Sequence, residues 1–515
     1  MIIYDRFQVS NNYGGENSLS EYDYDLAIFV KNFVGFTFNY FNILDNEKIR
    51  ENSPYELIDV IRLLVYANVN GITSTLQISN NSEKHYLYHL VSNYLIISDR
   101  SLRDYRKEYK EIFVKILSFT LIFAHCIGFT NFEHIALDGT ILKAFNSPFN
   151  ILKMDDIDNL IKHYTIEKLD DETIKDLRLS AQNFIFSENL TDNEKIETLY
   201  TLKEILTKSK QSSIGINDIT AKWMYNKQHR KQISFNLQHG VDVKTNLICG
   251  INVTRNPTDH YEIPALMENI ITNLNGIQPK IISADTIYRT IPNLTYLNNK
   301  NITALTPTRK QGKESINNLN KDPYSSDYFP YDREKDVVIC PKKEILKPYG
   351  PYPCKPDKFG FIRQQKVYSN YSACQKCPAK EKCCKKSKHR TITRYNHELL
   401  DKAEELMEEK ENKIEYKKRS RVESPNGPYK TYYHINELHI IGIEYMQCII
   451  EEIAAAFNLK RYFNKVDQRI SRNPGNGSFP RKERDPRSFW QACIHIHGRD
   501  RWTDRRYSAG RSRLL

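Results

Sequence analysis

Two apolar segments of the chain end in an aspartate. The first runs from His134 to Asp138 and is followed by a Gly-Thr pair, and the second runs from Lys280 to Asp285. Each is typical of a buried strand that presents its acid at the carboxyl end. If the strands are neighbours, the two carboxylates meet at one sheet edge and repel each other unless a divalent cation bridges them. Either aspartate alone could equally cap a strand-to-loop turn.

A third group of residues is spaced as Tyr-x2-Arg-x3-Glu-x6-Lys, and its members are Tyr416, Arg419, Glu423 and Lys430. This pattern resembles the signature of DDE transposases from prokaryotic insertion sequences. In that family the first acid lies in a strand before Gly-Thr, the second ends a later strand before a tyrosine, and the glutamate lies on a helix after a long insertion. The same features occur here in the same order, and the likeness runs from about residue 53 to residue 463.

The resemblance implies an α/β fold with an RNase H-like mixed-sheet core, in which Asp138, Asp285 and Glu423 hold two Mg²⁺ or Mn²⁺ ions. Such ions activate a water or a 3′-hydroxyl and stabilise the leaving oxygen. The implied function is metal-dependent cleavage and strand transfer at the terminal inverted repeats of an insertion sequence. Its partners would be double-stranded DNA, both repeat and target, and further copies of the chain in a homodimer or higher multimer.

The same resemblance gives roles to the residues around Glu423. Arg419 and Lys430 would clamp phosphates, and Tyr416 would contact the DNA backbone or position a nucleotide. A solvated helix face is the alternative interpretation of these three side chains.

The chain departs from the family pattern just after Glu423. The family commonly has an aromatic residue where Asn426 stands, and Pro425 and Pro428 flank that position. Two prolines here predict that the helix of Glu423 ends early or is shifted. A catalytically impaired, transposase-derived DNA-binding protein is therefore the alternative hypothesis.

Six of the ten cysteines fall within 45 residues. A Cys-x2-Cys pair with two further thiolates suits tetrahedral zinc, which would organise a segment without a large core. The candidate ligands are Cys340, Cys374, Cys377 and Cys383, and Cys354 or Cys384 could replace one of them. A collection of reduced thiols is the alternative, and a zinc-organised structural or regulatory DNA-associated protein is a third, more distant hypothesis.

Two other acids compete with the predicted pair. Asp242 and Asp259 both lie among turn residues, so the sequence predicts that they form turns and take no part in the site.

The elements that must position these residues divide the chain into five parts. The spacing of apolar residues over 53–130 predicts helices, and the first of them is expected to start at Ser53. Strands are expected over 232–239, 247–254 and 302–306, and helices over 263–274, 397–414 and 437–463. Residues 1–130 are helical and are expected to bind DNA ends. Residues 131–310 form the first part of the core, with a helical insertion over 155–212, and residues 311–395 form the cysteine-rich insertion. Residues 396–465 form the C-terminal helices of the core, and residues 466–515 are an Arg-rich tail of uncertain origin.

Composition sets wider limits. The formal net charge is +12 over 515 residues, and residues 466–515 hold 12 Lys and Arg against 5 Asp and Glu, which favours a polyanionic partner. No segment reads as a signal peptide or is apolar enough to span a bilayer, and no phosphate-binding or dinucleotide fingerprint occurs. A cytoplasmic, nucleoid-associated protein with reduced cysteines is expected.

Overall fold

The structure is a computed structural model that describes residues 20–472, apart from short gaps. The gaps are residues 48–49, 51–52, 148, 189, 210, 227, 312–321, 350–364, 385–386, 396–397 and 438–439. Cys354 and residues 473–515 of the predicted tail lie outside the described residues. Within the described part, no helix is long and apolar enough to cross a membrane.

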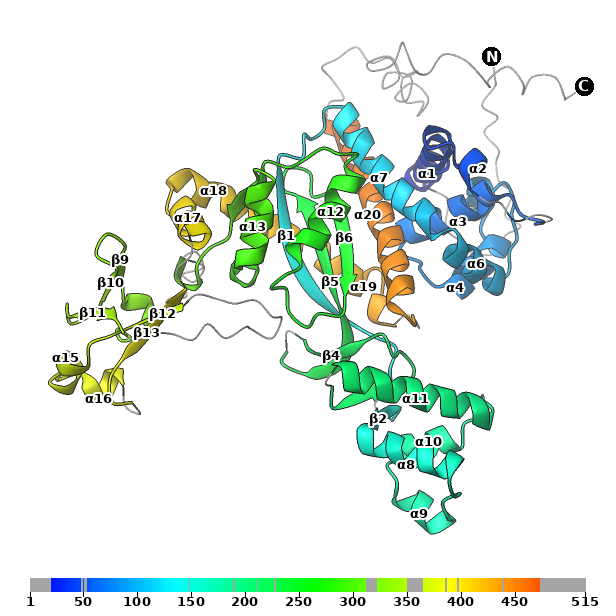
Figure 1. Cartoon of the computed structure of the whole chain (residues 1–515). Helices are drawn as coiled ribbons and strands as arrows, with labels where there is room; N and C mark the ends of the chain where they lie inside the picture. Colours follow the sequence, from blue (N-terminus) through cyan, green and yellow to red (C-terminus); the bar gives the residue numbers. More distant parts are fainter. Residues whose placement is uncertain are drawn as a thin grey trace, which may run out of the picture.

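Seven helices form the N-terminal part (Figure 1): α1 Glu21–Tyr40, α2 Ile43–Asn46, α3 Leu57–Val69, α4 Thr75–Lys84, α5 Tyr86–Val91, α6 Asp99–Glu108 and α7 Lys110–Cys126. Helix α3 starts at Leu57, later than predicted, because the Ser53 hydroxyl accepts a hydrogen bond from the nearby Tyr55 amide and caps no helix. The apolar faces of α3 and α7 pack on the C-terminal helix α20, Ile443–Arg472, in one continuous core. A buried ion pair between Arg106 and Glu452 (2.8 Å) joins α6 to α20.

A six-stranded mixed sheet forms the centre of the molecule: β1 His134–Lys143, β4 Lys222–Tyr225, β5 Lys231–Asp242, β6 Ile248–Thr254, β7 Ile281–Ser283 and β8 Thr303–Leu305. Strands β6, β5 and β1 are antiparallel neighbours, and β7 and β8 follow parallel to β1. The predicted strands and helix α12, Ile263–Asn273, are all present. The free edge of β6 is capped by side chains, because Asn458 and Gln447 of α20 and Asn269 of α12 bond its backbone.

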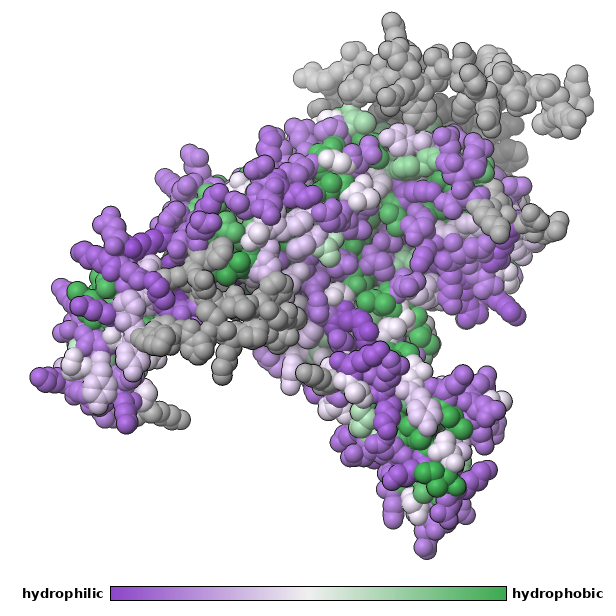
Figure 2. Space-filling model, viewed as in Figure 1, coloured by the Kyte–Doolittle hydropathy of each residue, from purple (hydrophilic) through white to green (hydrophobic). Residues whose placement is uncertain are grey.

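The insertion after β1 folds around its own small core. It comprises β2 Ile151–Lys153, α8 Met154–Thr165, α9 Asp171–Asp176, α10 Leu179–Ile185, α11 Asp192–Ser209 and β3 Ser213–Gly215. It extends below the sheet as a separate lobe (Figure 1), and its surface mixes hydrophilic side chains with apolar patches (Figure 2).

The cysteine-bearing segment contains a five-stranded antiparallel sheet that the sequence did not predict: β9 Tyr331–Asp332, β10 Val337–Ile339, β11 Ile345–Pro348, β12 Gln365–Ser369 and β13 Thr391–Tyr395. Its strands have two to five residues, too few for a periodic pattern to be recognised. Short helices α15, Tyr371–Gln375, and α16, Lys380–Cys383, carry Cys374 and Cys383, and Cys377 lies between them.

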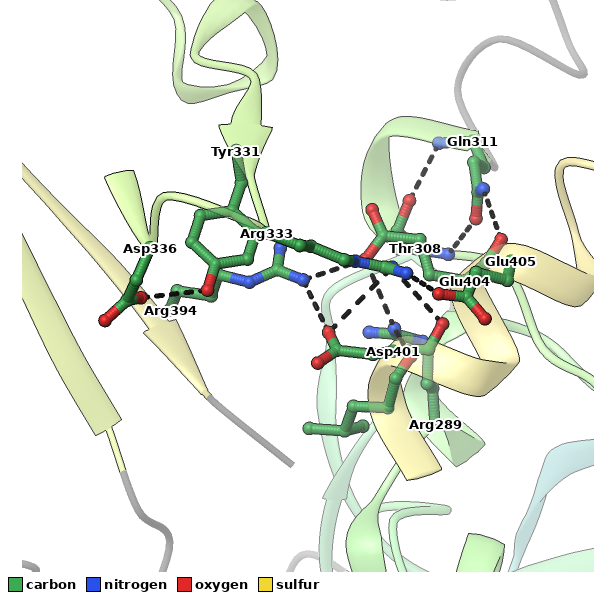
Figure 3. A network of polar contacts seen from close by, with 11 residues as sticks. Arg289, Thr308, Gln311, Tyr331, Arg333, Asp336, Arg394, Asp401, Glu404 and Glu405 are labelled. Carbon is green, nitrogen blue, oxygen red and sulfur yellow. Dashed lines mark hydrogen bonds and ion pairs between the residues drawn. The ribbon is translucent and has the colours of Figure 1, made fainter. Parts of the chain in front are cut away.

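A network of ion pairs joins this small sheet to the rest of the molecule (Figure 3). The helix predicted over 397–414 is two helices, α17 Glu398–Leu406 and α18 Lys410–Lys417. Carboxylates of α17 pair with Arg394 of β13 and with Arg333 of the β9–β10 turn, and Arg289, four residues after Asp285, also reaches this helix. Three further short elements lead to α20: η3 Lys418–Glu423, α19 Asn426–Thr431 and η4 Ile435–Glu437.

Candidate active site

Asp138 lies in the middle of β1, and Asp285 lies two residues beyond the end of its parallel neighbour β7. The prediction that the first strand ends at Asp138 is wrong, because β1 continues to Lys143. Ala136 of β1 is in register with Ser283 of β7, so the two acids, each two residues further on, lie level with each other. Asp285 caps the short helix η1, Thr286–Tyr288, and its Oδ1 accepts a hydrogen bond of 2.8 Å from the Ile287 amide. The sheet thus brings together the two acids that the sequence singled out.

Both carboxylate oxygens of Asp138 are bonded by residues of the Glu423 segment. Nη2 of Arg419 lies 3.1 Å from Oδ1, and Nδ2 of Asn426 donates to Oδ2 at 3.3 Å. The side chains of Arg419 and Asp138 are only 16% and 14% exposed, which strengthens the ion pair relative to one in water. Lys430 donates to the Thr140 hydroxyl, two residues along β1, at 3.2 Å.

The electrostatics link these side chains into one site. Burial raises the pKa of Asp285, Arg419 opposes this shift, and the charge of Asp138 adds to it. Burial also raises the pKa of Tyr416, with Arg419 again opposing and both aspartates adding. Tyr416, Arg419 and the two aspartates therefore lie within electrostatic reach of one another.

Glu423 does not join the two aspartates. It is the last residue of η3, its side chain is exposed, and it has no hydrogen bond or ion pair within the part of the chain that the structure describes. An α-helix would advance about 400° between Arg419 and Glu423, whereas a 3₁₀-helix advances about 480°, so the two side chains leave η3 in different directions. The predicted convergence of Asp138, Asp285 and Glu423 is not present in this structure.

The prolines account for this local geometry, as the sequence predicted. Ser424 and Pro425 keep helical dihedral angles, but Pro425 has no N–H to give to the carbonyl of Arg421, and that carbonyl is bonded by the Ser424 amide in the 3₁₀ pattern. Pro428 falls in the first turn of α19, where a missing N–H costs little.

Two histidines with no predicted role, His134 and His239, hold these elements in place. His134 Nδ1 donates to Glu415 of α18 (2.6 Å), and its Nε2 is 2.8 Å from the Ser283 hydroxyl, so one buried imidazole ties β1, β7 and α18 together. Burial lowers the pKa of His134, and Glu415 opposes this shift. His239, opposite Asp138 in β5, donates to the Val422 carbonyl at 2.9 Å and anchors η3. No sequence signal marks them, because each contact joins segments far apart in the chain.

The two competing acids behave differently from each other. Asp242 forms a turn, as predicted, because its Oδ2 accepts from the amide (2.9 Å) and hydroxyl (2.6 Å) of Thr245. Asp259 also lies in a turn, as predicted, and its carbonyl accepts a hydrogen bond from the Glu262 amide. Its carboxylate is turned inward onto β5, burial raises its pKa, and the charges of Asp285 and Asp138 raise it further.

The donor set at Asp138 and Asp285 suits a hard divalent cation, since both acids supply oxygen ligands. Two buried polar atoms beside Asp138, Nε of Arg419 and Oδ1 of Asn426, have no hydrogen-bond partner among the described residues, so the site has unused polar groups. No group of three His, Cys, Asp or Glu side chains in the described ranges is arranged to hold a metal ion. The two aspartates therefore offer oxygen ligands of the kind that a divalent cation takes, but among the described residues they do not make up a complete metal site.

The four predicted zinc ligands surround one pocket. Cys340, Cys374, Cys377 and Cys383 all line it, together with Arg390 and several apolar residues, and all four are free thiols. Sγ of Cys340 accepts a hydrogen bond of 3.3 Å from the Lys342 amide. Burial raises the pKa of Cys383 to about 11, and the neighbouring cysteines add to this shift. The thiols are near one another but are not arranged as a metal-holding group among the described residues.

A comparison with known families matches the later part of the chain. The family model described as a transposase DDE domain matches residues 339–463, which include strands β11 to β13 of the cysteine-bearing sheet and the segment from Tyr416 to Lys430 but neither Asp138 nor Asp285. No curated protein and no solved structure matches the chain. The family match supports a DDE transposase.

Proposed function

We propose that this chain is a transposase that cuts DNA at the terminal inverted repeats of an insertion sequence and joins the freed ends to target DNA. The observation that carries the proposal is the register of β1 with β7, which sets Asp138 of β1 level with Asp285 just beyond β7, together with the bond from Arg419 of the matched segment to Asp138. The strand order β4-β5-β1-β7-β8, in which β6 also pairs antiparallel with β5 and in which β7 and β8 run parallel to β1, supports an RNase H-like core.

Asp138 and Asp285 would hold Mg²⁺ or Mn²⁺, and Glu423 would complete the set after its segment turns. When bound, the ions would supply an activated water or 3′-hydroxyl and stabilise the leaving oxygen. Arg419 and Lys430 would bind phosphates once DNA arrives, and Tyr416 would contact the DNA beside them. The half-buried floor formed by β1 and β7 would limit the access of water to the reacting bond.

Cleavage of a labelled duplex carrying the element's end tests this function. We expect cleavage only with Mg²⁺ or Mn²⁺, and we expect Asp138→Asn, Asp285→Asn and Glu423→Gln each to abolish it. DNA binding should persist in all three variants because it depends on Lys and Arg side chains. Normal cutting by any of the three variants would refute the assignment of that residue, and normal cutting by all three would refute the proposed chemistry.

A further inference from the structure

A buried polar cluster lies against the backbone of β1, next to Asp138. Asp259, in the loop between β6 and α12, accepts two hydrogen bonds on Oδ1, from Nδ2 of Asn236 (2.7 Å) and from Nε2 of Gln238 (2.6 Å). Both donors belong to β5, and Gln238 is the register partner of Gly139. Two amides on one oxygen fix the position of this carboxylate.

The glycine after Asp138 shows how closely the cluster approaches β1. A Cβ atom at Gly139 would lie 2.5 Å from Nε2 of Gln238 and 2.6 Å from Oδ1 of Asp259, closer than Cβ atoms approach such groups in proteins. A side chain at this position would therefore have to displace the hydrogen-bonded side chains of Gln238 and Asp259. The Asp-Gly pair noted in the sequence thus reflects direct packing of Asp259 on the strand that carries Asp138.

The same cluster also reaches the turn that carries Asp285. Oε1 of Gln238 accepts a hydrogen bond from the hydroxyl of Tyr288, which is fully buried and is the last residue of η1. A second connection comes from His260, next to Asp259, whose carbonyl accepts from Thr290 and Asn293 just after η1, at 2.8 Å in each case. The Asp259 loop therefore contacts both β5, which pairs with the strand of Asp138, and the residues that follow η1, which Asp285 caps.

We propose that Asp259 is a positioning residue of the active site, which acts through Gln238 and Tyr288 to fix Asp285 beside Asp138. This inference rests on the proposed function. A neutral amide could accept the same two hydrogen bonds, so hydrogen bonding alone does not require a carboxylate. Three carboxylates within electrostatic reach repel one another, and a divalent cation at Asp138 and Asp285 would convert this repulsion into attraction.

Binding of Mn²⁺ to the full chain without DNA, followed by electron paramagnetic resonance, tests the inference. Asp259→Asn removes the charge and keeps an acceptor, whereas Tyr288→Phe keeps the charge and cuts the connection to Asp285. We expect each variant to bind Mn²⁺ about threefold to tenfold more weakly than the unchanged chain. Asp242→Asn is the matched control, because Asp242 is a buried acid at the end of β5 whose carboxylate hydrogen-bonds Thr245 of its own turn and Thr130, and the Mn²⁺ affinity of this variant should stay unchanged.

Each outcome decides a different point. Unchanged Mn²⁺ affinity in both Asp259→Asn and Tyr288→Phe overturns the inference while the proposed function stands. Unchanged affinity in Asp259→Asn alone overturns the part played by the charge of Asp259. Weaker binding in Asp259→Asn but not in Tyr288→Phe overturns the route through Gln238. An equal loss in Asp242→Asn would show a general effect of buried charge and overturn the specific role. No Mn²⁺ binding by the unchanged chain overturns the inference together with the metal dependence of the proposed reaction. Thermal unfolding of every variant confirms that the folded chain is compared.

Discussion

Arg419 and Asp138 are 281 positions apart in the chain, yet the guanidinium of one lies 3.1 Å from the carboxylate of the other. The two side chains come from η3 and β1, and both are largely buried. A metal ion and a guanidinium compete for the same carboxylate, because each is a cation that needs its oxygens. The contact therefore links DNA binding to metal binding in the proposed reaction. A DNA phosphate that binds Arg419 would release Asp138 to bind the metal ion.

The first prediction concerns this competition. We expect Arg419→Gln to bind Mn²⁺ more tightly than the unchanged chain in the absence of DNA, by about threefold to tenfold, because a competing positive charge has been removed. The same variant should bind duplex DNA more weakly. Lys417→Gln, an exposed cation on the same segment, is the control and should leave Mn²⁺ binding unchanged. Weaker Mn²⁺ binding by the Arg419 variant would contradict the competition.

The second prediction concerns the direction of Glu423. Pro425 already has helical dihedral angles, so Pro425→Ala restores an N–H without strain and lets the carbonyl of Arg421 take an α-helical bond. We expect the segment to wind as an α-helix, with Glu423 moved toward the face of Arg419 and with tighter Mn²⁺ binding measured by titration.

Pro428→Ala is the matched control for this change. Pro428 lies in the first turn of α19, where an added N–H gains no partner within the helix, so Mn²⁺ affinity should stay the same. If both variants bind Mn²⁺ as the unchanged chain does, the prolines do not determine the position of Glu423.

The sequence predicted the sheet and its two acids because the information is local there. Runs such as His134 to Asp138 are apolar, short and ended by an acid, so strand and carboxylate could be recognised together. The direction of Glu423 could not be recognised, because it depends on whether a few residues wind as an α- or a 3₁₀-helix. Pro425 and Pro428 were the only local sequence signal that the segment departs from a regular α-helix.

The inward direction of the Asp259 carboxylate was missed for a different reason. Its turn residues were recognised, but a turn says nothing about where the side chain points, and its partners Asn236 and Gln238 come from another strand. The contacts of His134 likewise join residues 149 and 281 positions apart. Such contacts exist only once the sheet has formed.

The third prediction concerns the cysteine pocket. If Cys340, Cys374, Cys377 and Cys383 close around zinc, protein purified from zinc-containing medium should carry about one zinc per chain by elemental analysis. Cys377→Ser should lose the metal, because three thiolates and a hydroxyl bind zinc more weakly. Cys126→Ser, an exposed cysteine outside the pocket, should keep it. Zinc-free protein whose thiols all titrate in the native state would leave the four cysteines as ordinary reduced thiols.

The fourth prediction concerns stability against pH. Glu451 of α20 accepts a hydrogen bond of 2.6 Å from Gln447, and burial raises its pKa to about 7. In the unfolded chain this glutamate ionises near its ordinary value, so the folded state holds the proton more tightly than the unfolded state does. Ionising this buried carboxyl lowers the free energy of unfolding. The loss is absent below about pH 4.5, grows as the pH rises toward 7, and is complete above that value.

Glu451→Gln removes the ionisation and can still accept the bond from Gln447. At pH 8 we expect the variant to have a larger free energy of unfolding than the unchanged chain, by about 2 to 3 kcal/mol, because a shift of one pKa unit corresponds to about 1.4 kcal/mol. At pH 4 the two proteins should unfold at the same temperature, because the glutamate is then protonated in both states. Glu444→Gln, whose carboxylate lies on the exposed start of the same helix, should show no such dependence. An equal gain in the free energy of unfolding at both pH values would show that the substitution improves packing and that the charge of Glu451 has no part in the effect.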